Sequence, residues 1–315
     1  MSAADHSARA LGYKLLGPRL DYILHLRPAE WPIMAGHTLL GALLALGLAR
    51  AVAGEQMGAI LLGLVLWVVA LNGGTLAINS AFDKDEGDVA YLRRPPEPPR
   101  GLFAFGLGLM VAGLFVSLLL PRMYTWLYVT CLVMSMLYSV PPMRLKAVAG
   151  ADWLINLVGF GTLTPLAGWA STGEALTVWG WFIVWGFGAL FAGFYPLTQL
   201  YQFDEDERRG DRTFALLLGK RRSMAVSIGC VVVAFGLFVA AARAAGWTAG
   251  DVARWAALAV AFVVWMVLLV PWHRAAESWS PARHQRGMYL ALGAWALTDI
   301  AVLYGWACGL EGLRA

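Results

Sequence analysis

The run MGAILLGLVLWVVALNGGTLAINSAFDKDEG, from Met57 to Gly87, is the most informative part of the sequence. Residues 57–82 are almost wholly apolar, and about 20 such residues let a helix cross the ~30 Å hydrocarbon core of a bilayer. The end of the run is acidic, with Asp83, Asp85 and Glu86 directly behind the apolar part. The run therefore predicts a transmembrane helix that brings a block of carboxylates to one membrane surface.

Apolar runs of similar length recur along the whole chain. The 315 residues have a mean hydropathy of +0.63 and only 14% charged residues, so they are far more apolar than a soluble domain. We expect an all-α, polytopic membrane protein whose nine transmembrane helices surround a central cavity, at residues 31–52, 57–82, 102–120, 123–140, 153–171, 177–203, 221–242, 252–271 and 287–309. Residues 1–30 are expected to form a cytoplasmic or interfacial segment without a signal peptide, and residues 31–315 one transmembrane domain.

The distribution of cations predicts the orientation in the membrane. If the spans alternate in direction, nineteen of the 24 Lys and Arg residues fall on one side, and these residue types are retained on the cytoplasmic side. We expect a cytoplasmic N-terminus and a location in the bacterial inner (plasma) membrane. The net charge of +4 then reflects orientation, and no nucleic-acid partner is expected.

A second acidic block follows the sixth predicted span. It reads YQFDEDERRGDRTFALLLGKRR, from Tyr201 to Arg222, and it lies on the same membrane side as the first because spans two and six run in the same direction. The spacing predicts one polar helical face in each block, formed by Asn79, Asp83 and Glu86 in the first and by Gln199, Gln202 and Asp206 in the second. For Asp88, Glu205, Glu207 and Asp211, a solvated loop is an equally good interpretation.

Mg²⁺ is the metal that such groups suit. It prefers hard oxygen ligands and is usually held by one or two carboxylates together with the phosphate oxygens of a substrate. The neighbouring arginines and lysines would contact the phosphate oxygens that the metal leaves free. Carboxylates, Mg²⁺ and cations at the mouth of an apolar helix bundle predict a binding site for a lipid diphosphate.

With these features, the chain resembles the UbiA superfamily of intramembrane prenyltransferases over nearly its whole length. That family has nine transmembrane helices, an N-D-x-x-D-x-x-x-D motif after the second and a D-x-x-x-D motif after the sixth. Here NSAFDKDEG keeps Asn79 and Asp83 but has Ser80 and Gly87 at the other two positions, and Asp85, Glu86 and Asp88 are the candidates for the missing carboxylate. In the second motif Asp206 matches, Gln202 stands at the first Asp, and Asp204 is an alternative ligand.

Two basic segments extend the resemblance. YSVPPMRLK, Tyr138 to Lys146, is similar to the Y-S-x-x-P-x-R-x-K segment of the family and implies that Arg144 and Lys146 contact a diphosphate. The RRPP segment lies where relatives have R-P-x-P-S-G and implies the same for Arg94. Without the resemblance, Arg144 and Lys146 would be ordinary cytoplasmic anchors.

The resemblance implies Mg²⁺-dependent transfer of a prenyl group from a prenyl diphosphate to an aromatic or lipid acceptor within the membrane. Asn79, Asp83 and Asp206 would be catalytic; the metal ligands would be Asn79, Asp83, Glu86, Gln202 and Asp206, with Asp85, Asp88 and Asp204 in reserve; the diphosphate would contact Arg94, Arg144, Lys146 and Gln202. Aromatic side chains would shield the allyl cation from water, and the candidates are Trp153, Phe160, Trp169, Phe194, Tyr195 and Tyr201.

Three alternatives remain open at this stage. A terpene cyclase on the same scaffold would ionise the diphosphate and close the chain on itself. A secondary transporter could use Asp83 and Asp206 for ion coupling, although transporter sites usually lie near the membrane midplane. A CDP-alcohol phosphotransferase is also a membrane Mg²⁺ enzyme, but its D-G-x-x-A-R opening does not occur here.

Overall fold

The computed structural model describes residues 3–83, 92, 94–210 and 212–308, and these residues form helices joined by short loops. The chain divides into two compact units: unit 1 comprises Met1–Gly36 and Leu61–Met143, and unit 2 comprises His37–Ile60 and Arg144–Ala315. No β-strand occurs within the described ranges, so the expected all-α class is confirmed.

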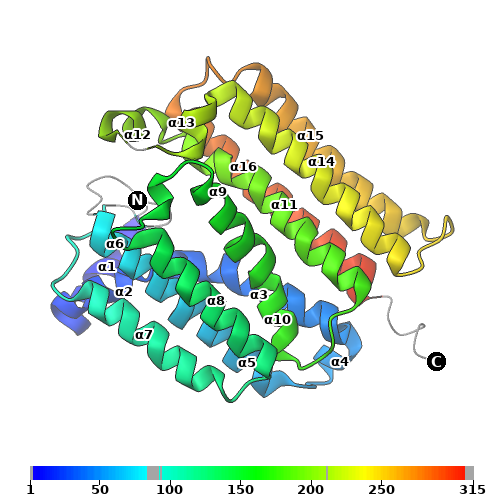
Figure 1. Cartoon of the computed structure of the whole chain (residues 1–315), viewed down its shortest axis with the longest axis horizontal. Coiled ribbons are helices and arrows are strands. Elements are labelled where there is room, and N and C mark those ends of the chain that lie inside the picture. The colour runs from blue at the N-terminus through cyan, green and yellow to red at the C-terminus, as the bar shows by residue number, and fades with distance from the viewer. Residues whose placement is uncertain (1–2, 84–91, 93, 211, 309–315) are drawn as a thin grey trace. The chain divides into compact units, whose positions relative to one another are not determined.

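Unit 1 is built on a long helix, of which residues 61–83 belong to this unit and residues 57–60 to unit 2. This helix runs without a break through α5 (Met57–Leu64), the π-helical stretch η3 (Val65–Gly73) and α6 (Gly74–Asp83). Around it pack α7 (Leu102–Ser117) and α8 (Arg122–Ser139), and α2 (Leu20–His25) contacts α6 (Figure 1). The remaining elements here are α1 (Ala3–Leu16), η1 (Gly17–Arg19) and η2 (Pro28–Glu30).

Glycine allows α6 and α7 to approach closely. A Cβ atom at Gly106 would meet the carbonyl oxygen of Gly74 at 2.9 Å, so neither position has room for a side chain. Two buried tyrosines bind α8 to the neighbouring helices. The Tyr124 hydroxyl donates to the carbonyl of Gly63 in α5 at 2.7 Å, and the Tyr128 hydroxyl donates to the carbonyl of Met110 in α7 at 3.0 Å. Small residues and hydroxyl–carbonyl bonds are the contacts that hold helices together where water is absent.

Unit 2 has the larger core. Helix α11 (Val178–Leu200) packs against α14 (Lys220–Ala244), α16 (Pro281–Val302) and the π-helical stretch η5 (Leu157–Leu163), while α15 (Val252–Arg274) lies beside α14 and α16 (Figure 1). The other elements are α3 (Trp31–Leu46), which begins in unit 1, α4 (Leu48–Val52), η4 (Leu145–Ala147), α9 (Ala151–Asn156), α10 (Thr164–Ser171), α12 (Phe203–Arg209), α13 (Phe214–Leu218) and η6 (Leu303–Ala307). Large buried side chains such as Phe187, Phe238, Trp265 and Trp272 fill the space between the helices.

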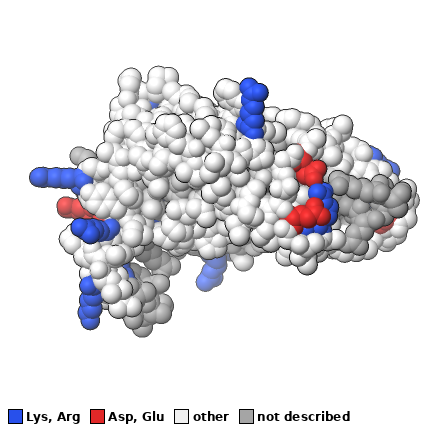
Figure 2. Space-filling view, turned by 90° about the horizontal axis from the view of Figure 1, so that it is seen from below, with Lys and Arg blue, Asp and Glu red and all other residues white. Residues whose placement is uncertain are grey.

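Six helices among the described residues are long and apolar enough to cross a membrane. They are Pro28–Leu46, Met57–Asp83, Val178–Leu200, Lys220–Ala244, Val252–Arg274 and Pro281–Ala307, and Leu102–Ser117 is a shorter apolar helix. Figure 2 shows a surface dominated by uncharged residues, with charged atoms confined to small groups. The chain is thus an integral membrane protein, and the number of nine spans stays a prediction.

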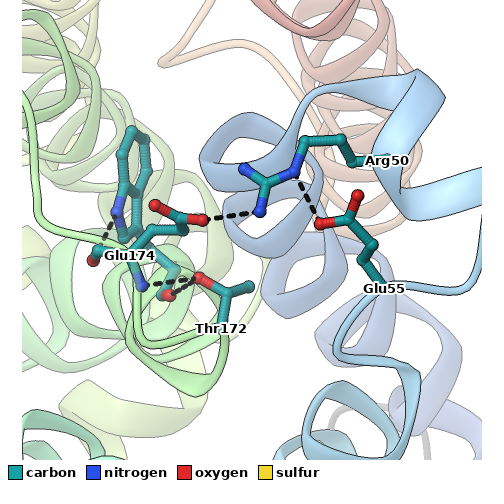
Figure 3. Close-up of polar contacts among 5 residues, drawn as sticks. Arg50, Glu55, Thr172 and Glu174 are labelled. Atoms are coloured by element: carbon teal, nitrogen blue, oxygen red, sulfur yellow. Dashed lines mark hydrogen bonds and ion pairs between the residues drawn. The ribbon is translucent and has the colours of Figure 1, made fainter.

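An ion-pair network joins two loop regions of unit 2 (Figure 3). The guanidinium of Arg50, in α4, lies 2.7 Å from Glu55 and 2.8 Å from Glu174, which follows α10. Next to it, the Thr172 hydroxyl accepts a hydrogen bond from the Glu174 backbone N–H at 3.2 Å. The two carboxylates raise the pKa of Arg50, with Glu55 the larger cause.

Candidate active site

The first amide–carboxylate pair ends the long helix of unit 1. Asn79 and Asp83 are one helical turn apart on α6, and both side chains are half-buried. The Ser139 hydroxyl, at the end of α8, lies 3.4 Å from the Asn79 side-chain oxygen. Because α6 is regular up to Asp83, the predicted spacing places these two groups on one face. The other candidates of this motif, Asp85, Glu86 and Asp88, lie outside the described residues.

The second pair lies in unit 2 on a short helix of its own. Helix α11 ends at Leu200, and α12 begins at Phe203 with Gln202 at its N-cap position. The backbone N–H of Asp206 donates to the carbonyl of Gln202 at 2.9 Å, so these two residues stand one turn apart. The Asp206 side chain is buried, with 9% of its surface exposed.

The predicted single face of Gln199, Gln202 and Asp206 is wrong. The chain turns at Tyr201 and Gln202, so Gln199 belongs to α11 and the other two belong to α12. Asp204 also has a partner that the sequence did not indicate: its carboxylate pairs with the ammonium group of Lys220 at 3.2 Å, and that ammonium lies over the Phe203 ring at 4.9 Å. The carboxylate of Asp204 is therefore engaged in an ion pair with Lys220.

Asp152 organises the surroundings of the second pair, and sequence reasoning missed it. Its side chain is fully buried. One carboxylate oxygen accepts a hydrogen bond from the Gly150 N–H at 2.9 Å. The other oxygen accepts from the Gln199 amide at 2.9 Å and from the Phe214 N–H at 3.1 Å, with the Tyr195 hydroxyl at 3.4 Å.

This network closes the loop that carries the second pair. Gln199 stands at the end of α11 and Phe214 at the start of α13, so one carboxylate fixes both ends of the segment between them. The Gln199 side-chain oxygen adds a bond from the Ala215 N–H at 2.9 Å. A signal for Asp152 was present in the sequence, because it is an acid directly before the predicted span 153–171, and ionisable groups at membrane depth are costly and usually functional.

Two of the predicted diphosphate-binding cations lie in strained backbone. Arg94 has φ 46° and Arg144 has φ 35°, in the left-handed region that residues with a Cβ atom seldom adopt. Such residues cost about 1–3 kcal/mol each and cluster at functional sites. Lys146, the third predicted cation, lies two residues after Arg144 in η4 and is half-buried.

The predicted aromatic wall divides into two groups. Trp153 stacks on Phe214 at 5.3 Å, Phe160 stacks on Phe191 at 5.4 Å, and Phe191 also stacks with Tyr195 at 6.4 Å. Phe194 contacts Phe191 at 6.0 Å, and Tyr201 is partly buried. Trp169, in contrast, packs against Trp179 in the core and donates to the Glu174 carbonyl, so it is a structural residue of unit 2.

The donor set fits Mg²⁺ bound through a substrate. Among the residues that the structure describes, no three His, Cys, Asp or Glu side chains form a cluster that could hold a metal by themselves. Each motif instead presents one carboxylate and one amide oxygen, Asp83 with Asn79 and Asp206 with Gln202. All are hard oxygen donors, and few protein ligands are needed where phosphate oxygens and waters complete the octahedron.

Comparison with known proteins decides the family. The sequence model of the UbiA prenyltransferase family matches residues 38–293, a range that includes both pairs. The chain belongs to the UbiA prenyltransferase family. It is therefore a membrane prenyltransferase, and the resemblance read from the motifs is confirmed.

Three individual proteins show the degree of similarity. A digeranylgeranylglyceryl phosphate synthase of Natronomonas pharaonis is 28% identical over 218 residues, which cover 66% of this chain and 73% of that protein. A UbiA homolog from Archaeoglobus fulgidus, solved bound to GPP and Mg²⁺, has a TM-score of 0.63 at 16% identity, covering 91% of this chain and 99% of that one. A solved digeranylgeranylglyceryl phosphate synthase has a TM-score of 0.68 at 15% identity, covering 91% and 98%. The solved structures establish a shared fold.

Proposed function

We propose that this UbiA-family protein catalyses the Mg²⁺-dependent transfer of a prenyl group from a prenyl diphosphate to an aromatic or lipid acceptor within the membrane. The observation that carries the proposal is the matched placement of Asn79 with Asp83 and of Gln202 with Asp206, each pair on one helical turn. Two similar proteins support it, because one UbiA homolog was solved bound to GPP and Mg²⁺ and the relative from Natronomonas pharaonis is a digeranylgeranylglyceryl phosphate synthase.

In this proposal the two pairs hold the metal and the cations hold the phosphates. Asp83 and Asp206 supply the negative charge, and the amide oxygens of Asn79 and Gln202 complete the protein ligands. Mg²⁺, when bound, would neutralise the charge that develops on the leaving diphosphate. Arg94, Arg144 and Lys146 contact the remaining phosphate oxygens; forked guanidinium groups suit that geometry.

The rest of the chemistry falls to apolar side chains. As the bond between the prenyl C1 and the diphosphate oxygen breaks, the allyl group carries positive charge until the acceptor forms its new bond to C1. The rings of Phe160, Phe191 and Tyr195 present faces that attract such a cation by roughly 0.5–2 kcal/mol each, and they exclude water. The proposal also includes a single transmembrane domain at residues 31–315, with nine spans, a central cavity and the acidic pairs on the cytoplasmic side.

Purified protein in lipid nanodiscs tests the proposal. It is supplied with Mg²⁺, radiolabelled prenyl diphosphates of increasing length, and either para-hydroxybenzoate or a glycerol phosphate monoether. Diphosphate release that requires both Mg²⁺ and an acceptor, with the label recovered in the acceptor, is the expected result. A cyclic hydrocarbon formed without acceptor would replace transfer by cyclisation, and an absence of diphosphate release with every acceptor would overturn the proposal.

A further inference from the structure

A histidine and an aspartate meet inside unit 2, away from both acidic motifs. His37 lies on α3 within the span Pro28–Leu46, and Asp299 lies on α16 within the span Pro281–Ala307. The His37 Nδ1 is 3.7 Å from the nearer carboxylate oxygen of Asp299. Ionisable groups in the middle of membrane spans are costly and usually functional.

The hydrogen-bonding capacity of this pair is unused. His37 is 94% buried, since only 6% of its surface is exposed, and neither ring nitrogen makes a hydrogen bond to the described residues. The facing oxygen of Asp299 is likewise unbonded, because 3.7 Å is too long for a hydrogen bond. Leaving one buried polar atom unsatisfied costs about 1–3 kcal/mol. A bound group that donates and accepts hydrogen bonds would remove that cost.

Aromatic rings hold the imidazole in place. Phe187 lies edge-on to it at 4.9 Å and Trp295 at 5.2 Å, so rotation of the ring is restricted. Neither of these two aromatic rings can carry a charge, and Asp299 is the ionisable residue that faces His37. A histidine fixed by packing, with a carboxylate behind one nitrogen and the other nitrogen unbonded, has the arrangement of a general base.

Contacts within unit 2 connect this pair with the second motif. Trp295 contacts Phe191 at 5.8 Å, Phe191 contacts Tyr195 at 6.4 Å, and the Tyr195 hydroxyl lies 3.4 Å from Asp152. Asp152 in turn fixes both ends of the segment that carries Gln202 and Asp206. A series of side-chain contacts therefore links the His37–Asp299 pair to the segment that carries the second motif.

We infer that His37 and Asp299 form the acceptor side of the active site, where His37 binds the hydroxyl group of the acceptor and removes its proton. The inference rests on the proposed prenyl transfer. The acceptor O–H bond breaks as the proton passes to the His37 Nε2. The oxygen of an alcohol, or the ring carbon next to the oxygen of a phenol, then forms its bond to the prenyl C1; in the phenol, the hydrogen of that carbon afterwards moves to the oxygen as a proton. The C1–oxygen bond to the diphosphate breaks, and diphosphate leaves with that electron pair. Asp299 is a positioning residue that orients the ring and stabilises its protonated form.

The substrate class that follows is an acceptor with a free hydroxyl group, whether an alcohol or a phenol. The two sources share the O–H donor that His37 needs, so both para-hydroxybenzoate and a glycerol phosphate monoether are assayed. Each is compared with its methyl ether, which carries one additional methyl group and lacks the proton. Binding is measured calorimetrically, without prenyl diphosphate, so that this readout does not depend on turnover.

The wild-type protein should bind one hydroxyl compound about tenfold more tightly than its methyl ether, a ratio at the upper end of what one hydrogen bond contributes. The His37→Ala variant should bind both equally. Its transfer rate should fall roughly 10²-fold or more, as for loss of a general base, and added imidazole should restore part of the rate. His37→Gln should keep the preference for the hydroxyl compound yet transfer as slowly as His37→Ala, because an amide accepts a hydrogen bond but not a proton.

Two comparisons keep the test decisive. His273→Gln changes a histidine of α15 whose ring contacts the Arg221 carbonyl, and it should leave binding and rate unchanged. If His37→Ala does not fold, as judged by thermal unfolding, His37→Gln and Asp299→Asn decide, and Asp299→Asn should lower kcat with little change in acceptor KM. Full transfer by a folded His37 variant, or equal wild-type binding of every hydroxyl compound and its methyl ether, would overturn the inference. A wild-type protein that transfers nothing would instead refute the proposed function.

Discussion

The two acidic motifs of this UbiA-family protein are held in place by different means. Asn79 and Asp83 end a continuous helix, and their relative position follows from the helical repeat alone. Gln202 and Asp206 lie on a separate short helix, α12, whose flanking segments are fixed by the hydrogen bonds of one buried carboxylate, Asp152. The first motif is therefore placed by local structure and the second by tertiary contacts. Mutations should affect the two motifs differently except where they remove the charge itself.

Removing the carboxylate of either motif should have the same large effect on activity, although the two motifs are held in place differently. We expect Asp83→Ala and Asp206→Ala each to lower prenyl transfer by at least about 10²-fold, the usual loss when one group that stabilises developing charge is removed. Acceptor-dependent diphosphate release measures the effect. Asp204→Ala is the matched control on α12: its exposed pair with Lys220 contributes about 1 kcal/mol at most, so activity and folding should persist. Full turnover by Asp83→Ala or Asp206→Ala would contradict the metal assignment.

Removing the side chains that hydrogen-bond to each motif or its flanking segments should affect protein stability differently for the two motifs. Asp152→Ala leaves the Gly150 and Phe214 N–H groups and the Gln199 amide without their acceptor, so the free energy of unfolding should fall by about 3 kcal/mol or more. Ser139→Ala removes a single 3.4 Å contact to Asn79 and should cost less than about 1 kcal/mol. Thermal unfolding in detergent compares the two variants. Equal, small losses would show that Asp152 is not the anchor of its segment.

Closely packed glycines test whether the helix of each motif depends on its neighbour. Gly106→Ala would push a Cβ atom against the Gly74 carbonyl of α6, and Gly193→Ala would push one against the Ser227 carbonyl beside α11. Overpacking of this kind costs about 1–3 kcal/mol, so both variants should unfold at lower temperature.

Each of these glycines has a control on a neighbouring turn or helix. Gly108 of α7 and Gly229 of α14 face open space, so Gly108→Ala and Gly229→Ala should be neutral or raise helix stability by up to about 1 kcal/mol. A control that is as destabilised as its partner would assign the effect to loss of glycine and not to helix contact.

The smallest expected effect concerns unit 1 and pH. Burial lowers the pKa of His25, against the opposing effect of the Pro96 and Glu97 carbonyls. The unfolded chain then takes up a proton at a higher pH than the folded chain, so stability is complete above the ordinary histidine pKa of about 6.5 and decreases as pH falls below it. The melting temperature of the wild type should decline more than that of His25→Gln between about pH 7.5 and about pH 5.5. Parallel declines would show that His25 is not responsible.

The sequence predicted what depends on composition and on the helical repeat. The apolar runs specify membrane helices, and the spacing of Asn79 and Asp83 places them on one face because α6 continues through both. The same argument failed for Gln199 because nothing in the local sequence marks the end of α11 at Leu200. That end is fixed by two hydrogen bonds of the Gln199 side chain, which donates to Asp152, 47 positions away, and accepts from the Ala215 N–H, 16 positions away. The pairing of Asp204 with Lys220 is likewise a tertiary contact that spacing does not reveal.

Because of the π-helical stretch η3, the first motif should tolerate the deletion of one upstream residue, and the second motif has no such stretch in its own helix. A π turn holds about one residue more than an α turn, and η3 lies upstream of Asn79 and Asp83 on the same continuous helix. Deleting one residue from Val65–Gly73 would let the helix rewind as a regular α-helix with both side chains still aimed as before. The same deletion between Asn79 and Asp83 would swing one away from the other by about 100°. The additional residue of this helix thus lies where its loss would not change the relative position of Asn79 and Asp83.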